Sequence, residues 1–225
     1  MKCLFGQSYY LIFDPKLYSA MKPYPPLGTL YAASATREAG YDVALFDAML
    51  AQSESEWETA LTAHQPQVAI IYEDNFNYLS KMCLGRMRSA ALTMIGMAKK
   101  RGCIVIVCGS DATDHPNIFL DGGADYVLLG EGEETLIELM ASLSGKADTS
   151  PEAILGVQSP KTLMPIRRPA MRDIDKLPMP AWDLIDVAKY KNIWLARHGY
   201  FSMNLVTTRG CPYHCNWCAK PIWGQ

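Results

Sequence analysis

Residues 122–136 read Gly122-Gly123-Ala124-Asp125-Tyr126-Val127-Leu128-Leu129-Gly130-Glu131-Gly132-Glu133-Glu134-Thr135-Leu136. This stretch indicates one strand, loop and helix of an α/β sheet. The run 126–129 is short and apolar, as expected when both faces of a parallel strand are covered. Acidic residues then stand in and just before the first turn of a helix predicted over 133–143, where they complement the helix dipole. A glycine-containing loop therefore joins the carboxyl end of the strand to the helix.

The same alternation of strand and helix runs through the first 145 residues. Short apolar runs predict strands at 2–5, 42–46, 68–72, 104–108 and 126–129. Helical patterns between them predict helices at 27–39, 53–63, 79–101, 117–121 and 133–143. The sequence therefore predicts a doubly wound, parallel, five-stranded α/β sheet of the Rossmann or flavodoxin-like type over residues 1–145.

A connector is predicted over residues 146–200, and a third region over 201–225. The connector is rich in proline, which breaks regular structure, and only 154–157 is predicted as a short strand. Its run Leu177-Pro178-Met179-Pro180-Ala181-Trp182 is expected to pack at a domain junction, although a plain linker with one buried tryptophan explains it equally well. The pair Arg167-Arg168 is interpreted as solvated and not as a phosphate site.

Loops at the carboxyl ends of the predicted strands are the candidate ligand site. Sheets of this class bind ligands in the crevice at that edge, and glycines there let backbone amides approach a ligand closely. Each loop alone is also explained by the turn that it makes. The predicted ligand-binding residues are Pro26, Leu27, Gly28, Gly109, Ser110, Asp111, Gly130, Glu131 and Gly132.

Three cysteines near the end of the chain, Cys211, Cys215 and Cys218, have the spacing CxxxCxxC. Three thiolates this close converge on one centre if the backbone forms a compact loop, and soft thiolates suit an iron–sulfur cluster or zinc. A structural zinc site usually takes four protein ligands, whereas three cysteines leave one iron of a cluster open to a small molecule. The alternatives are a zinc-bound structural domain that uses His214 or a distant residue as fourth ligand, and a set of uncommitted thiols.

Composition limits the function classes. The 225 residues are 49% hydrophobic and carry a formal net charge of −2, which gives no electrostatic argument for nucleic acid or a membrane surface as partner. No apolar run approaches the roughly 18 residues that span a bilayer. Seven cysteines without a signal peptide favour a reducing compartment, so a cytoplasmic protein is expected. Outside the run, the cysteines are expected to be small core residues.

The cysteine run and the residues before it, Thr208-Arg209-Gly210, resemble the signature of the radical S-adenosylmethionine (SAM) superfamily. The resemblance implies that Cys211, Cys215 and Cys218 hold a 4Fe–4S cluster whose open iron binds SAM for reductive cleavage. It implies that Trp217 lies beside the adenine and that residues 204–208 form the first strand of the SAM barrel. It also implies an electron donor such as flavodoxin or ferredoxin.

Four stretches, 25–33, 37–43, 108–113 and 122–136, resemble the cobalamin (B12)-binding domain that precedes the SAM domain in many radical SAM enzymes. The resemblance implies that the loop residues given above contact cobalamin. It implies no protein histidine on cobalt, because the Asp-x-His-x-x-Gly motif of methionine-synthase-like domains does not occur. Two further departures are the acidic and aromatic segment 73–78 and a Cys-Gly-Ser turn at 108–110 in place of Gly-Gly-Pro.

The two resemblances together cover essentially the whole chain and imply the N-terminal part of a cobalamin-dependent radical SAM enzyme. Methyl transfer or an oxidative cyclase-like reaction is expected, and no residue of this chain is expected to act as a general base. The alternatives are a radical SAM protein that keeps the B12-type fold without binding cobalamin, and a non-catalytic B12-binding sensor or carrier. Because a complete barrel needs roughly 200 residues, the SAM domain is expected to be truncated and the chain alone to have no turnover.

Overall fold

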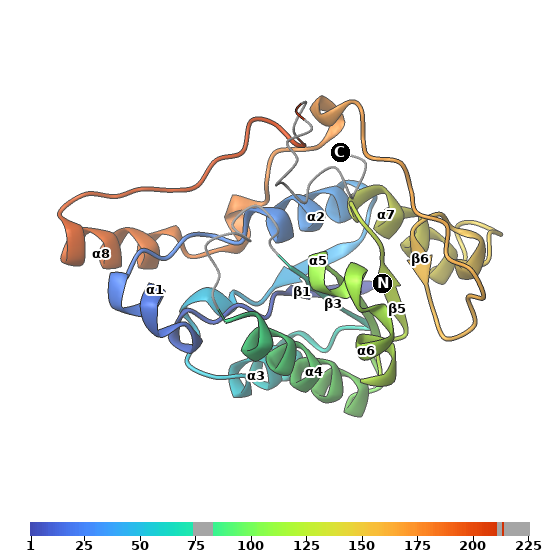
Figure 1. Ribbon diagram of the computed structural model, residues 1–225, viewed down its shortest axis with the longest axis horizontal. Helices are drawn as coiled ribbons and strands as arrows, with labels where there is room; N and C mark the ends of the chain where they lie inside the picture. The colour runs from blue at the N-terminus through green and yellow to red at the C-terminus, as the bar shows by residue number, and fades with distance from the viewer. Residues whose placement is uncertain (74–82, 211–212, 214–225) are drawn as a thin grey trace.

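The computed structural model of the chain describes residues 1–73, 83–210 and 213. A six-stranded sheet runs through it in the order β2-β1-β3-β4-β5-β6 (Figure 1). The strands are β1 (Lys2–Gly6), β2 (Asp42–Leu45), β3 (Val68–Tyr72), β4 (Ile104–Cys108), β5 (Tyr126–Leu128) and β6 (Val157–Gln158). Strands β1 to β5 are parallel, whereas β6 is antiparallel to β5. The predicted doubly wound parallel sheet is confirmed, with one strand more than the predicted five.

Helices cover both faces of this sheet, α2 and α7 on one face and α3 and α4 on the other (Figure 1). The α-helices are α1 (Pro15–Ala20), α2 (Leu27–Glu38), α3 (Ser55–His64), α4 (Leu84–Lys100), α5 (Ser110–Asp114), α6 (Pro116–Asp121), α7 (Glu133–Leu143) and α8 (Val187–His198). Five of them match predicted helices to within a few residues; the start predicted for α4, at 79, lies outside the described residues. None of the described helices has the length and apolar character that crossing a membrane requires.

Successive side chains of each strand pack on opposite faces of the sheet. In β3, Val68, Ile70 and Tyr72 pack against the α2 and α7 side, whereas Ala69 and Ile71 pack against the α3 and α4 side. All five are buried, which is the pattern that a parallel sheet covered on both faces requires. The continuous apolar strands of the sequence therefore have a direct structural reason.

The sixth strand comes from the connector and corrects the predicted short strand at 154–157. The paired residues are Val157 and Gln158, opposite Leu128 and Val127 of β5. The turn before them needs Gly156, whose φ is +83° and whose carbonyl accepts a 2.8 Å hydrogen bond from the Leu129 amide. Connector residues thus belong to the sheet and its core, while the boundaries 1–145, 146–200 and 201–225 remain predictions.

Three other expectations from the sequence are corrected. Residues 204–208 form no strand, because a strand needs a hydrogen-bonded neighbour and no described strand pairs with them. Arg168 is not solvated: its side chain is 15% exposed, and it bonds to Glu134, Glu138 and the Thr135 hydroxyl of α7. Trp182, expected to be buried, is half-buried. It packs on a small apolar cluster that joins α8 to the loop after β1.

Candidate functional site

The sheet reverses its strand order between β1 and β3, so their carboxyl ends flank the crevice where ligands of such sheets bind. The nine predicted loop residues all lie at this carboxyl edge: three at the start of α2, three at the end of β4 and start of α5, and three between β5 and α7. The Thr29 hydroxyl of α2 donates a 2.6 Å hydrogen bond to the Tyr72 carbonyl at the end of β3. This bond fixes the first turn of α2 against the crevice.

The loops after β4 and β5 are joined by one buried hydroxyl. Thr113 donates a 2.8 Å hydrogen bond to the Gly109 carbonyl and accepts a 3.1 Å bond from the Gly130 amide. The turn at Gly130 has φ +81°, and among the described residues, its two chain neighbours aside, no atom lies within 4 Å of the position that a β-carbon would take there. The two glycine loops are therefore held together with open space beside Gly130. Thr113 was not among the predicted site residues, although a threonine four residues after a loop glycine is a usable signal.

Gly132 is required by packing and not by open space. A β-carbon at this residue would lie 2.5 Å from the Cys108 sulfur and 2.9 Å from the Tyr72 hydroxyl oxygen. Burial raises the pKa of the Cys108 thiol, and the carboxylate of Glu133 raises it further. Burial likewise raises the pKa of Tyr72 well above its ordinary value, with Cys108 and Glu133 adding to the effect. Both groups are therefore protonated at neutral pH and form a neutral floor beneath the loop.

Glu73 follows β3 and forms hydrogen bonds to the segment after β1 and to the end of β4. Its Oε1 accepts a 2.8 Å hydrogen bond from the Ser8 amide after β1, and its own amide donates a 2.9 Å bond to the Cys108 carbonyl. The Glu73 β-carbon lies 2.8 Å from the position of a β-carbon on Gly109. The absence of a side chain at Gly109 thus makes room for Glu73.

Two predicted ligand contacts already have protein partners. Asp111 forms a bidentate ion pair with Arg88 of α4 and lies 3.2 Å from the ring Nδ1 of His115. The Glu131 carboxylate accepts a 2.7 Å hydrogen bond from the Met171 amide of the connector. These carboxylates hold the loops in place and do not project as free charges.

A buried ion pair at the start of α7 was not predicted from the sequence. The guanidinium of Arg209 donates to both oxygens of Glu133, at 2.6 and 3.2 Å. The side chains are 13% and 4% exposed, and the guanidinium lies 5.9 Å from the ring centroid of Tyr31. Burial lowers the pKa of the Arg209 guanidinium, but the hydrogen bonds and charge of Glu133, together with Tyr72 and Glu131, outweigh burial and raise it. The pair joins residues 76 positions apart in the chain.

The three cysteines of the run, together with Trp217, lie outside the described residues. Among the residues that are described, no group of three His, Cys, Asp or Glu side chains is placed to hold a metal ion. Cys3, Cys103 and Cys108 are buried and Cys83 is half-buried. The expectation that these four are small core residues is confirmed for the first three.

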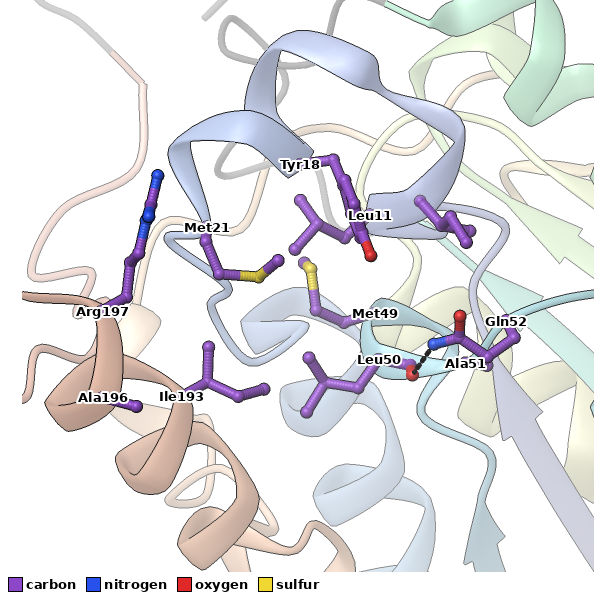
Figure 2. A pocket seen from close by; sticks show the side chains of 11 residues that line it. Leu11, Tyr18, Met21, Met49, Leu50, Ala51, Gln52, Ile193, Ala196 and Arg197 are labelled. Atoms are coloured by element: carbon purple, nitrogen blue, oxygen red, sulfur yellow. Dashed lines mark hydrogen bonds between the residues drawn. The ribbon is translucent and has the colours of Figure 1, made fainter.

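A separate cavity of about 370 Å³ lies between α1, α8 and the 3-10 turn η2 (Ala48–Leu50). Figure 2 shows Met21, Met49 and Ile193 among the side chains around it, with Arg197 at its rim. Its lining is mostly apolar, and it includes none of the nine predicted ligand-binding residues. This cavity is therefore distinct from the loops after β4 and β5.

Comparison with known proteins agrees with this geometry. The family model described as "B12 binding domain" matches residues 18–140, more than half of the chain. The anaerobic magnesium-protoporphyrin IX monomethyl ester cyclase of Synechocystis is 26% identical over 89% of this chain and 39% of that protein. An uncharacterised methyltransferase of Pyrococcus horikoshii is 27% identical over 88% of this chain and 41% of its own length. The chain thus spans about two fifths of these curated relatives.

Among solved structures, one similar fold is that of the cobalamin-dependent S-adenosylmethionine radical enzyme OxsB with aqua-cobalamin and S-adenosylmethionine bound. The TM-score is 0.72 at 17% sequence identity, over 96% of this chain and 28% of that one. At this identity the similarity establishes the fold. It extends through the sheet and the connector.

Proposed function

Because the chain belongs to the B12-binding domain family, we propose that it binds cobalamin at the carboxyl edge of its sheet, as part of a cobalamin-dependent radical SAM enzyme. One observation carries the proposal: the two glycine loops after β4 and β5 are clamped together by Thr113, with open space beside Gly130. Such loops let backbone amides and carbonyls approach a large ligand closely, because no side chain projects between them.

The residues present fit a corrin in three respects. Gly130 leaves room for close approach, Tyr72 and Cys108 supply a neutral floor, and the carboxylate of Asp111 is neutralised by Arg88. Bound cobalamin supplies a carbon carrier or redox centre. The chain's own part is to hold the group in place and to exclude water from it. No protein histidine is proposed as a cobalt ligand, since no Asp-x-His-x-x-Gly run occurs.

The second part of the proposal concerns the cysteine run. Its spacing supports a 4Fe–4S cluster on Cys211, Cys215 and Cys218, with SAM on the open iron and Trp217 beside the adenine. The names of the relatives, a cyclase and methyltransferases, support methyl transfer or oxidative cyclisation as the reaction of the whole protein. A flavodoxin or ferredoxin as electron donor and a cytoplasmic location belong to the same proposal.

Hydroxocobalamin titration of two glycine variants tests the binding site. Asparagine tolerates positive φ, so Gly130→Asn keeps the turn but places a side chain in the open space. We expect cobalamin to bind at least about tenfold more weakly, because the loss of about 1.4 kcal/mol of binding free energy has that effect. Gly145→Asn is the control, because Gly145 also has positive φ (+71°) and open surroundings but lies after α7. Equal affinity of Gly130→Asn and wild type would contradict the site.

Glu73 favours a second candidate, a radical SAM protein that keeps the fold without cobalamin. Its side chain fills the space beside Gly109 and bridges to Ser8 across the crevice. Under this alternative, the folded wild-type chain binds no corrin and Glu73→Ala gains binding. Under the leading proposal, the wild-type chain already binds.

A further inference from the structure

The Glu133–Arg209 pair connects two parts of the proposed machinery that lie far apart in sequence. Glu133 is the first residue of α7 and directly follows the Gly130–Gly132 loop. Arg209 stands two residues before Cys211 in the sequence, and two residues of backbone span at most about 7 Å. A fixed Arg209 therefore limits where the cysteine run begins.

We infer that Glu133 and Arg209 form a positioning pair that anchors the cysteine run to the carboxyl edge of the sheet, beside the loop proposed to hold cobalamin. The anchor itself rests on the geometry of the ion pair, whereas its effect on an iron–sulfur cluster rests on the proposed function. Both oxygens of Glu133 accept from the planar guanidinium, which fixes orientation as well as distance. Glu131, 4.0 Å away, adds a second negative charge on the same side.

Burial separates this pair from the ion pairs on the surface. Arg37 and Asp183 also form a bidentate, long-range pair, but their side chains are 43% and 63% exposed. Exposed pairs of that kind contribute little to structure. Removal of one partner from a buried pair leaves an uncompensated charge and has a much larger effect. Glu133 also stands in the first turn of α7, where the helix dipole favours a carboxylate.

Limited digestion with trypsin tests the anchor without any cofactor. Trypsin needs the arginine side chain in its own acidic pocket, so the bond after Arg209 is cut only when the pair opens. Glu133→Gln is expected to speed this cleavage at least about tenfold, the lower end for a lost charged hydrogen bond. Cleavage after Lys176, whose side chain is 77% exposed, is the internal reference.

The matched control for that digest is Glu134→Gln, the neighbouring acid of α7, which pairs with Arg168 instead. It removes the same charge from the same helix turn and is expected to leave cleavage after Arg209 unchanged. Equal cleavage after Arg209 in wild type and Glu133→Gln would overturn the anchor. Equal acceleration at Arg209 and Lys176 would also overturn it, because that result indicates general loosening of the chain.

The consequence for the cysteine run is measured on the full chain after anaerobic loading with iron and sulfide. Arg209→Gln is expected to lose the cluster's visible absorption to a chelator several-fold faster than wild type, at unchanged far-ultraviolet circular dichroism. Arg209→Lys should fall between them, and Arg37→Gln should match wild type. Unchanged loss in Arg209→Gln would refute the positioning role. Failure of wild type to take up iron would refute the proposed cluster site, while the digest still decides the anchor.

Discussion

Gly132→Ala adds one methyl group at the most crowded point of the proposed site. The new β-carbon would lie 2.5 Å from the Cys108 sulfur and 2.9 Å from both the Cε2 and the hydroxyl oxygen of Tyr72. Both side chains are buried in the core on the α2 and α7 side, so neither has solvent to move into. The backbone at Gly132 has φ −103°, which any residue adopts. The expected effect is therefore overpacking alone.

Overpacking of a well-packed core costs about 1–3 kcal/mol. Alanine recovers roughly 0.4–1 kcal/mol by restricting the unfolded chain. The midpoints of these two ranges leave a net loss in the free energy of unfolding of about 1.3 kcal/mol. For a chain of this length each kcal/mol shifts Tm by about 2–4 °C, so Gly132→Ala should melt roughly 3–5 °C below wild type.

Thermal unfolding followed by circular dichroism measures this shift. Cys108→Ala in the same chain removes the nearest atom, so the double variant should be more stable than the sum of the single changes predicts, by about 0.5–3 kcal/mol for residues in contact. Gly96→Ala is the control: Gly96 lies inside α4, and apart from the backbone of that helix no described atom lies within 4 Å of the position of a β-carbon. Alanine there should stabilise the chain by about 0.5–1 kcal/mol. A Gly132→Ala chain as stable as wild type, or strictly additive changes, would refute the reasoning.

Three further results are expected. Burial raises the pKa of Asp47 above 3.8, although hydrogen bonds from the Tyr190 hydroxyl and a backbone amide act in the opposite direction. Folding therefore favours the neutral carboxyl group, and the stability that this preference contributes is lost as pH rises above about 4. Tm of Asp47→Asn minus Tm of wild type should therefore increase from pH about 4 to about 7, and a decrease would contradict this assignment. Burial raises the pKa of the Cys3 thiol to about 12. Alkylation at pH about 8, followed by peptide mass spectrometry, should therefore modify the half-buried Cys83 before Cys3. Modification of Cys3 before Cys83 would contradict the burial of Cys3. Asp186 caps α8 through the amides of residues 188 and 189, so Asp186→Ala should reduce the free energy of unfolding by about 0.5–2 kcal/mol in a denaturant titration, and no change would rule out the cap.

The parts of the fold that repeat a local pattern were predictable from the sequence. Apolar runs predicted the bounds of β1 to β5 to within one residue, and the glycine loops lie at the edge of the sheet where they were expected. Strand β6 has only two residues and depends on its pairing with β5, which no local pattern specifies. The strand expected at 204–208 has suitable residues but no described partner strand.

Contacts between residues far apart in the chain could not be predicted from the sequence for a different reason. Glu133 was read correctly as a first-turn acid of a helix, but nothing local links it to Arg209. The sequence indicates a solvated Arg168, whereas the fold brings its side chain onto α7. Thr113 lies close enough to Gly109 in sequence for its hydrogen bond to be anticipated, but its second bond, to Gly130, requires the neighbouring strand.

Corrin retention is the decisive experiment for cobalamin binding at the carboxyl edge of the sheet. The folded chain is mixed with excess hydroxocobalamin under anaerobic conditions, desalted, and its absorption spectrum compared with its protein concentration. A retained corrin band at close to one cobalamin per chain is expected, with the band reduced in Gly130→Asn and kept in Gly145→Asn. A chain that shows native circular dichroism and retains no corrin would contradict cobalamin binding and favour the alternative in which Glu73 fills the crevice.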